Sequence, residues 1–349
     1  MNSLLITGGA GFIGTNLVHH LAAVTDHRIV VLDALTYSGD LSGIGPLIKS
    51  GRIEFIEGDV AAPETVTHVF ARHQVDRVIH LAAESHVDRS IADAEQFLRT
   101  NITGTYVLLE AARAAWPDKD PATTRFVHVS TDEVFGDLGA QDAPFGANDR
   151  YRPSSPYAAS KASSDHLARA WQRTYGLPVM VTHCGNNYGP WQFPEKLIPL
   201  MILNAKDGAE LPVYGDGRQI RDWIHVDDHC SALRYVLERG TPGHTYLIGA
   251  NCERTNIGLV EQICDRVDQA LQRPAGSARA LIRHINDRPG HDQRYAVDAS
   301  TTHALGWRAA HTPETAMAGV IEWYLDHDRW CENIRSGEYR GWYRSQYSS

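Results

Sequence analysis

Tyr157 and Lys161 stand four residues apart in the segment Tyr157-Ala-Ala-Ser-Lys161, a spacing that places both side chains on one face of a helix. The pKa of a free tyrosine is about 10, and a nearby ammonium group lowers it by favouring the phenolate. Such a pair would act as a general base that accepts a proton from a hydroxyl. Taken alone the pattern is weak, because most such pairs are ordinary surface residues.

Two adjacent carboxylates follow a short β-branched run in the segment Ser130-Thr131-Asp132-Glu133. In a doubly wound sheet the carboxyl ends of the strands face the ligand crevice. A divided acid and base, one carboxyl protonated and its neighbour ionised, is the chemistry that this arrangement favours. The structural alternative is that Asp132 only caps a helix.

The segment TGGAGFIG, residues 7–14, directly follows the first apolar run and fits two glycine patterns, Gly9-x-Gly11-x-x-Gly14 and Gly8-x-x-Gly11-x-x-Gly14. Glycines at this spacing allow a tight turn, close backbone approach to a pyrophosphate and close helix packing, while the helix N-terminus attracts the anion. Asp33 ends the second apolar run, where a carboxylate can bind the ribose 2′-hydroxyl of NAD and would repel the 2′-phosphate of NADP. A simple turn residue is the alternative for Asp33. Asp59 would suit an adenine contact.

The elements that must position these residues alternate regularly along the first half of the chain. The apolar runs 3–7, 28–33, 52–59, 77–82, 125–130 and 178–183 predict strands, and amphipathic segments at 13–23, 100–116 and 157–176 predict helices. Nearly continuous apolar strands are typical of parallel sheets covered on both faces. The pattern therefore predicts an α/β fold with a Rossmann-type doubly wound parallel sheet.

The regular alternation of strands and helices ends after about residue 190, where connectors rich in proline and glycine separate shorter elements. Helices are predicted near 257–271 and 313–328. We expect a dinucleotide-binding domain over residues 1–190, with later strands around 221–248 interleaved into it. Residues 191–349 are expected to form mainly a smaller C-terminal lobe that binds the substrate.

Composition and charge exclude several function classes. The 349-residue chain has a formal net charge of −9, which disfavours nucleic acid as a partner. No apolar run reaches the ~20 residues of a membrane span, and no signal peptide is expected. Five scattered cysteines without a C-x-x-C spacing favour reduced thiols and a cytoplasmic location. The His225–His229 segment is interpreted as a strand end and a helix capped by Asp227, and no metal site is expected.

Several longer motifs together resemble one known family. They are TGGAGFIG (7–14), LAAESHVDRS (81–90), STDEVFG (130–136), SPYAASKASSDHL (155–167), NNYGPWQFPEKLIP (186–199), RDW (221–223) and DRPGHDQRY (287–295). This set resembles the dTDP-glucose 4,6-dehydratases, extended short-chain dehydrogenase/reductases of nucleotide-sugar metabolism. The resemblance covers nearly the whole chain, and the Thr-Asp-Glu, PEKLIP and DRPGHD segments are its most specific parts.

The resemblance implies a mechanism with recycled NAD and no net oxidation. Tyr157, helped by Lys161 and Thr131, would deprotonate the glucose 4-hydroxyl while hydride leaves C4. Glu133 would remove the C5 proton, and Asp132 would protonate the C6 hydroxyl as it departs as water. The product is a 4-keto-6-deoxy sugar. A cytoplasmic homodimer is also implied, with the helices at 100–116 and 157–176 as the contact.

The resemblance also assigns binding residues position by position. The residues expected to line NAD, with Tyr157 and Lys161, are Gly8, Gly11, Phe12, Ile13, Gly14, Asp33, Ala34, Leu35, Thr36, Asp59, Val60, Leu81, Ala82, Ala83, Glu84, Ser85, Thr100 and Asn187. Those expected to hold the sugar nucleotide are Ser85, Thr131, Asn186, Lys196, Leu197, Pro212, Val213, Tyr214, Arg221, Asn251, Asp287, Arg288, Pro289, Gly290 and His291. Arginines such as Arg221 and Arg288 suit a diphosphate, because guanidinium offers paired planar donors and a permanent charge.

Two alternative functions remain open at the level of sequence. A nucleotide-sugar 4-epimerase or decarboxylase would share the glycine loop and the Tyr157/Lys161 pair, but it does not need the adjacent acid and base. A non-catalytic NAD-binding regulator could lose the five catalytic candidates, all of which are present here. The base of the nucleotide rests on resemblance alone, so UDP- and other glucose nucleotides also remain open.

Overall fold

A seven-stranded sheet with every neighbouring pair parallel forms the centre of the protein. The computed structural model describes residues 2–118, 120–287 and 290–335. The strand order is β10-β6-β5-β4-β1-β2-β3. The strands are β1 (Ser3–Thr7), β2 (Arg28–Asp33), β3 (Ile53–Glu57), β4 (Arg77–His80), β5 (Arg125–Thr131), β6 (Val179–Cys184) and β10 (Thr245–Ile248). The predicted doubly wound sheet is confirmed.

Alternate residues of each central strand enter two different cores. Leu4 and Ile6 of β1 pack into one core, whereas Leu5 between them packs into the other. Both faces of a parallel sheet are covered by helices, so each strand is apolar along its whole length. The first core lies under α1 (Phe12–Val24) and α9 (Val226–Arg239), and the second lies under α3 (Pro63–His73), α6 (Gly104–Ala115) and α7 (Pro156–Tyr175).

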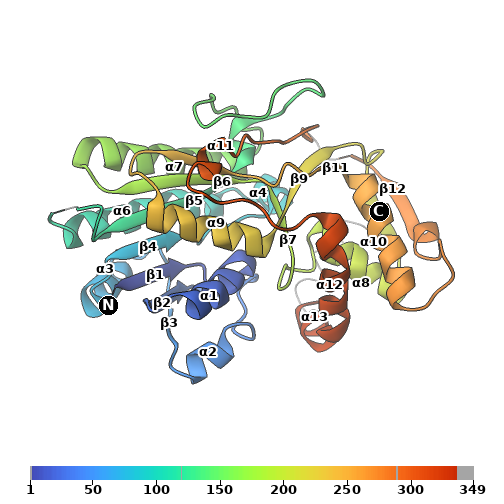
Figure 1. The fold of residues 1–349 in the computed structure, drawn as a ribbon, viewed down its shortest axis with the longest axis horizontal. Helices are drawn as coiled ribbons and strands as arrows, with labels where there is room; N and C mark the ends of the chain where they lie inside the picture. The colour runs from blue at the N-terminus through green and yellow to red at the C-terminus, as the bar shows by residue number, and fades with distance from the viewer. Residues whose placement is uncertain (1, 119, 288–289, 336–349) are drawn as a thin grey trace.

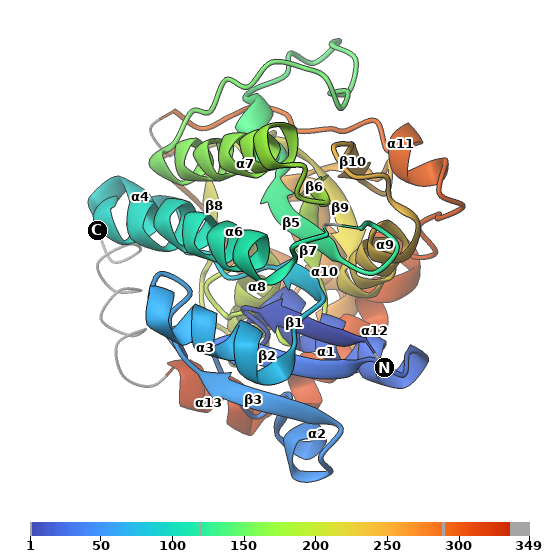
Figure 2. The same ribbon diagram turned by 90° about the vertical axis from the view of Figure 1, so that its left-hand side faces the viewer.

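Helices α6 and α7 lie side by side on one face of the sheet (Figure 2). The start of α7 is set locally, because the Ser155 hydroxyl accepts a hydrogen bond from the Ala158 N–H and Pro156 occupies the first turn. The helix predicted over residues 100–116 does not begin as an α-helix at residue 100. Residues Leu98–Thr103 form a π-helix, η1, before α6 begins at Gly104.

A second group of elements packs around its own core on the right-hand side of Figure 1. It contains α8 (Leu197–Asp207), α10 (Asn256–Ala270), α12 (Pro313–Asp326) and α13 (Asp328–Arg335). A three-stranded sheet joins β7 (Asn186–Tyr188), β9 (Ile220–His225) and β11 (Glu253–Thr255), and a two-stranded sheet joins β8 (Leu211–Tyr214) and β12 (Ile282–Ile285). Of the late strands, β10 joins the central sheet and β9 does not.

The remaining elements are short connections. They are α2 (Gly45–Lys49), α4 (Val87–Ala92), α5 (Glu95–Phe97), α11 (Ser300–His303) and the 3-10 helices η2 (Asp132–Phe135) and η3 (Arg279–Leu281). The prediction that Asp227 caps α9 is wrong. His225 is the N-cap, and its ring nitrogen accepts from the Asp227 N–H, so Asp227 lies in the first turn of the helix.

Candidate active site

A cavity of about 440 Å³ opens at the carboxyl ends of β1, β2, β4, β5 and β6. This is the edge at which a doubly wound sheet places its ligand crevice. All five catalytic candidates line it, from Thr131 to Lys161. Of the residues expected to line NAD, all but Leu35 line it as well. The side chain of Leu35 packs against the hydrophobic core, and its backbone N–H donates to Asp33.

The glycine loop leaves no room for side chains on its inner side. Gly8 has a left-handed φ of +72°, and a Cβ on it would lie 2.7 Å from the Ala82 nitrogen. A Cβ on Gly14 would lie 2.0 Å from the Gly8 carbonyl oxygen. Gly11 is the N-cap of α1 and offers no side chain to cap it. The first N–H groups of α1 therefore remain available for an anion.

Asp33 lies in the cavity where the sequence predicts a ribose contact. Its carboxylate accepts hydrogen bonds from the backbone N–H groups of Ala10, at 2.9 Å, and Leu35, at 2.9 Å. Burial raises the pKa of this carboxyl, and these two hydrogen bonds act in the opposite direction. Because each carboxylate oxygen has a second lone pair, Asp33 can still accept from a ribose hydroxyl.

Two segments bring the catalytic candidates together. Strand β5 ends at Thr131, and η2 then places Asp132 and Glu133, while the first turns of α7 place Tyr157 and Lys161 on the neighbouring side. Thr131 caps η2 through its hydroxyl, which accepts from the Glu133 N–H at 3.4 Å. The capping function that the sequence left open for Asp132 therefore belongs to Thr131.

The phenol of Tyr157 is protonated in the folded chain. Burial raises its pKa well above the ordinary value, with Glu133 and Cys184 adding to the effect, whereas a hydrogen bond with the Thr131 hydroxyl acts against it. Lys161 donates to the Val129 carbonyl at 2.8 Å. The expected lowering of the Tyr157 pKa is not seen in the chain alone, where burial raises it. Additional positive charge in the cavity would be needed to favour the phenolate.

The Asp132 carboxyl is buried, and burial raises its pKa well above the ordinary value. Glu133 adds to this rise, and the guanidinium of Arg221 opposes it. The rise favours the protonated carboxyl, which is the form that can give a proton as an acid. A carboxyl group that favours its protonated form beside a second carboxyl group is what an acid and a base in one site require.

The residues expected to hold the sugar nucleotide are only partly in the cavity. Ser85, Thr131, Asn186 and Lys196 line it, and the Lys196 ammonium donates to the Ser85 carbonyl at 3.4 Å. The other described members of this set do not line it and are Leu197, Pro212, Val213, Tyr214, Arg221, Asn251, Asp287, Gly290 and His291. Arg288 and Pro289 lie outside the described residues.

Arg221 connects the second lobe to the acid–base end of the cavity. Arg221, on β9, donates to backbone carbonyls of Ile220 and Asp292 and lies 4.5 Å above the Tyr295 ring. Its charge reaches Asp132. His291 is 2.6 Å from the Asp287 carboxylate. A sugar nucleotide that spans the cavity and these residues would therefore contact both groups of elements.

Sequence reasoning missed a cluster that joins three segments at the cavity. The Glu195 side chain is buried and lies 3.7 Å from both His86 and Arg89, and 3.4 Å from the Tyr37 hydroxyl. The Arg89 guanidinium lies 3.7 Å above the Tyr37 ring. No local signal marks these residues, because the cluster exists only once the segments meet.

Cys184 and Gly185 also line the cavity and were not predicted. Cys184 is the last residue of β6 and Gly185 follows it, so the rule that strand ends face the ligand would have found them. Burial raises the pKa of the Cys184 thiol to about 12, which keeps it neutral. In the described part of the chain, no group of three or more histidine, cysteine or acidic side chains could hold a metal ion. Within the same residues, no helix has the length and apolar character needed to cross a membrane.

Comparisons with known proteins agree on one group. Residues 5–319 match the family model described as GDP-mannose 4,6 dehydratase. The chain is 52% identical over 347 residues to a dTDP-glucose 4,6-dehydratase of Neisseria meningitidis, covering 97% of this chain and 98% of that protein. It is 49% identical to dTDP-glucose 4,6-dehydratase 1 of Escherichia coli, covering 99% and 98% of the two chains.

Solved structures place the fold in the same group. A Streptomyces venezuelae dTDP-glucose 4,6-dehydratase with NAD and dTDP bound has a TM-score of 0.87 and 41% identity, covering 95% of this chain and 99% of that one. A UDP-glucose 4-epimerase of Thermotoga maritima has a TM-score of 0.81 at 26% identity, covering 93% and 99%. The fold is thus common to both activities, and the site must distinguish them.

Proposed function

The chain belongs to the dTDP-glucose 4,6-dehydratase family, and we propose that it converts dTDP-glucose to dTDP-4-keto-6-deoxyglucose and water. The observation that carries the proposal is the position of Asp132 and Glu133 in the same cavity as Tyr157 and Lys161. Epimerisation at C4 needs a base and a hydride acceptor only. Loss of water needs an additional base at C5 and an acid at the C6 oxygen, and the adjacent carboxyls can supply both.

NAD is the cofactor that the glycine loop and Asp33 fit. The N-terminus of α1, next to the close contact of Gly14 with Gly8, would hold the pyrophosphate. The carboxylate of Asp33 would hold the ribose. Bound there, NAD would take hydride from C4 of the sugar and return it at C6. Arg99, which pairs with Asp59 at 2.5 Å, and Thr100 form the adjoining wall of the cavity.

The side chains divide the proton transfers among them. Tyr157 removes the proton of the 4-hydroxyl, with Thr131 orienting its phenol. Lys161 and the positive nicotinamide of bound NAD would together supply the charge that favours the phenolate. Glu133 takes the proton from C5, which the 4-ketone has made acidic, and a proton returns to C5 when hydride is added at C6. Asp132, whose pKa burial raises, gives its proton to the C6 hydroxyl as that group leaves as water. Burial of the site keeps bulk water from the 4-keto sugar.

The sugar nucleotide is proposed to lie across Ser85, Asn186 and Lys196 toward the second lobe. Lys196 and Arg221 supply positive charge for the diphosphate. On this basis residues 1–190 with β10 form the NAD-binding domain, and residues 191–349 contribute mainly to sugar-nucleotide binding.

We also propose that the protein works in the cytoplasm as a homodimer through α6 and α7. Large apolar side chains on and before these helices are exposed, with 45% of Tyr106, 40% of Tyr175 and 49% of Leu98 accessible. Because α6 and α7 lie side by side, these side chains offer a surface for the same pair of helices in a second copy.

Incubation of the purified protein with dTDP-glucose, UDP-glucose and GDP-mannose in separate reactions tests the proposed activity. We expect a product that is one water lighter and carries a 4-ketone, formed fastest from dTDP-glucose. Formation of a C4 epimer of unchanged mass would contradict the proposal and support the epimerase. Faster dehydration of UDP-glucose or GDP-mannose would contradict only the choice of nucleotide.

A further inference from the structure

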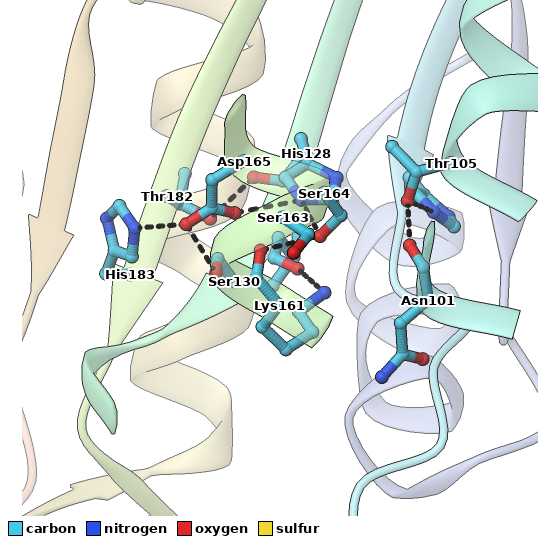
Figure 3. A network of polar contacts seen from close by, with 12 residues as sticks. Asn101, Thr105, His128, Ser130, Lys161, Ser163, Ser164, Asp165, Thr182 and His183 are labelled. Atoms are coloured by element: carbon cyan, nitrogen blue, oxygen red, sulfur yellow. Dashed lines mark hydrogen bonds and ion pairs between the residues drawn. The ribbon is translucent and has the colours of Figure 1, made fainter. Parts of the chain in front are cut away.

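A fully buried carboxylate lies one helical turn beyond Lys161. Asp165 stands four residues after Lys161 on α7, so the two side chains share one face of the helix. Figure 3 shows its carboxylate at the centre of a polar network between α7, β5 and β6. The residue does not line the cavity and makes no proposed contact with the sugar or the cofactor. A buried charge is costly unless it is paired and hydrogen-bonded, so its function needs an explanation.

Four side chains surround the Asp165 carboxylate. On β5, the His128 ring lies 3.1 Å from Oδ1, and the Ser130 hydroxyl donates to Oδ2 at 3.0 Å. On β6, the His183 ring lies 2.9 Å from Oδ2. The Tyr151 hydroxyl, from the loop before α7, donates to the same oxygen at 2.9 Å. One carboxylate therefore ties α7 to two adjacent strands and to its own preceding loop.

The same network fixes the two halves of the catalytic site relative to each other. Strand β5 continues from Ser130 directly into Thr131 and the acid pair, and the Val129 carbonyl accepts from Lys161. Ser164 donates to the Lys161 carbonyl at 2.8 Å and lies 3.1 Å from the His128 ring. A shift of α7 along β5 would have to break the contacts of Lys161, Ser164 and Asp165 with that strand together.

Asp165 also supplies charge. Burial lowers the pKa of the Lys161 ammonium, and the Asp165 carboxylate opposes this. Burial would raise the pKa of Asp165 itself, but His183 and His128 hold it well below its ordinary value. The other titratable groups that face Lys161 from the elements around it are Tyr157 on α7, His128 on β5, His80 on β4 and Cys184 on β6.

Most of those neighbours are neutral near pH 7. Burial lowers the pKa of His128 to about 4 and that of His80 well below its ordinary value, and it raises the pKa of Cys184 to about 12. Tyr157 is protonated for the same reason. Among these described groups, Asp165 is thus the one that carries a negative charge opposite the Lys161 ammonium.

We propose that Asp165 is a positioning residue for the dehydratase reaction, which holds the Tyr157/Lys161 helix in register with the acid pair on β5 and keeps Lys161 protonated. This inference rests on the proposed function, in which Lys161 supplies the positive charge beside the base Tyr157. It acts through Lys161 and β5, and it contacts neither the sugar nor the cofactor.

The test compares Asp165→Asn with wild-type holoenzyme in rapid-mixing measurements of C4 oxidation across pH. The amide keeps the shape of the side chain and removes its charge, so Lys161 loses its proton at lower pH. We expect the alkaline limb of the rate profile to move down by about one pH unit, with KM changed less than twofold. Ser163→Ala on the same helix is the matched control. Among the described residues its hydroxyl bonds only the Ala159 carbonyl, so its profile should equal that of the wild type.

A second variant separates anchoring from charge. Tyr151→Phe removes one donor to Asp165 and leaves the carboxylate in place, so it should lower kcat severalfold without moving the alkaline limb. An unmoved limb in Asp165→Asn would overturn the charge function, and an unchanged kcat in Tyr151→Phe would overturn the anchoring function. The second result is decisive even if Asp165→Asn fails to fold. A wild-type protein that does not oxidise dTDP-glucose would instead refute the proposed function.

Discussion

Replacement of Gly14 by alanine tests the glycine loop as a built site for a pyrophosphate. The added Cβ would lie 2.0 Å from the Gly8 carbonyl oxygen and 2.6 Å from the Gly9 Cα, both backbone atoms that cannot rotate away. Contacts of real Cβ atoms essentially never fall below 3.0 Å, so α1 must move away from the loop by about 1 Å. Overpacking of this kind costs about 1–3 kcal/mol of the free energy of unfolding. A displacement of about 1 Å also lowers turnover about 100-fold.

Three measurements on Gly14→Ala check this reasoning: the NAD content of the purified protein, its melting temperature with and without added NAD, and turnover. We expect less bound NAD and a smaller rise in melting temperature on NAD addition, because stabilisation by a ligand follows its affinity. Gly319→Ala is the matched control. Gly319 is an exposed residue inside α12 with nothing near its missing Cβ, so alanine there should stabilise by about 0.4–1 kcal/mol. A Gly14→Ala protein with wild-type NAD content and turnover would refute the steric argument.

Other variants separate the steps of the reaction and the contributions to stability. Tyr157→Phe should slow C4 oxidation by about 10²–10⁴-fold, and single-turnover NADH absorbance that matches wild type would exclude Tyr157 as the base. Glu133→Gln should abolish exchange of the C5 proton with solvent while some C4 oxidation continues, as followed by NMR in deuterated water; persistent exchange would assign the base elsewhere. Asp132→Asn should stop dehydration yet raise the midpoint of unfolding at pH 7. The raised pKa of Asp132 means that the folded state holds this proton more tightly than the unfolded state does. The free energy of unfolding of the wild type therefore falls as pH rises above about 4. At lower pH the free energies of unfolding of the two proteins should converge. Leu5→Ala, at a fully buried position between β1 and its helices, should cost about 2–5 kcal/mol in denaturant unfolding, and a loss below 1 kcal/mol would contradict the packing described.

The central sheet was predictable because its signal is local. Each strand is a short apolar run that two layers of helices bury, and the run from Ser3 to Thr7 is buried at every position. The glycine loop was predictable for a similar reason, since close contacts such as that of Gly14 with Gly8 permit no other residue. The order of the strands in the second lobe carries no such signal. Strands β8 and β12 pair across about 70 residues of chain.

Tertiary contacts explain what the sequence did not reveal about the site. The π-helix at Leu98–Thr103 places Asn101 so that its amide bonds both the backbone of Glu84 and the Ser160 hydroxyl, and no local preference encodes those partners. His225 caps α9 in place of Asp227 because its ring reaches the first turn in the folded chain. Asp165 is an ordinary polar residue of an amphipathic helix in the sequence. Only the packing of β5 and β6 against α7 gives it four partners.

The fate of a deuterium label at C4 of dTDP-glucose distinguishes dehydration from epimerisation in a single measurement. If Tyr157 and Lys161 govern the C4 step and Asp132 with Glu133 remove water before the hydride is returned, the label must move within one molecule. We predict a 4-keto-6-deoxy product with deuterium at C6, formed without added NAD and without net accumulation of NADH. Return of the label to C4 with inversion and no loss of water would contradict the dehydratase assignment and identify the protein as an epimerase.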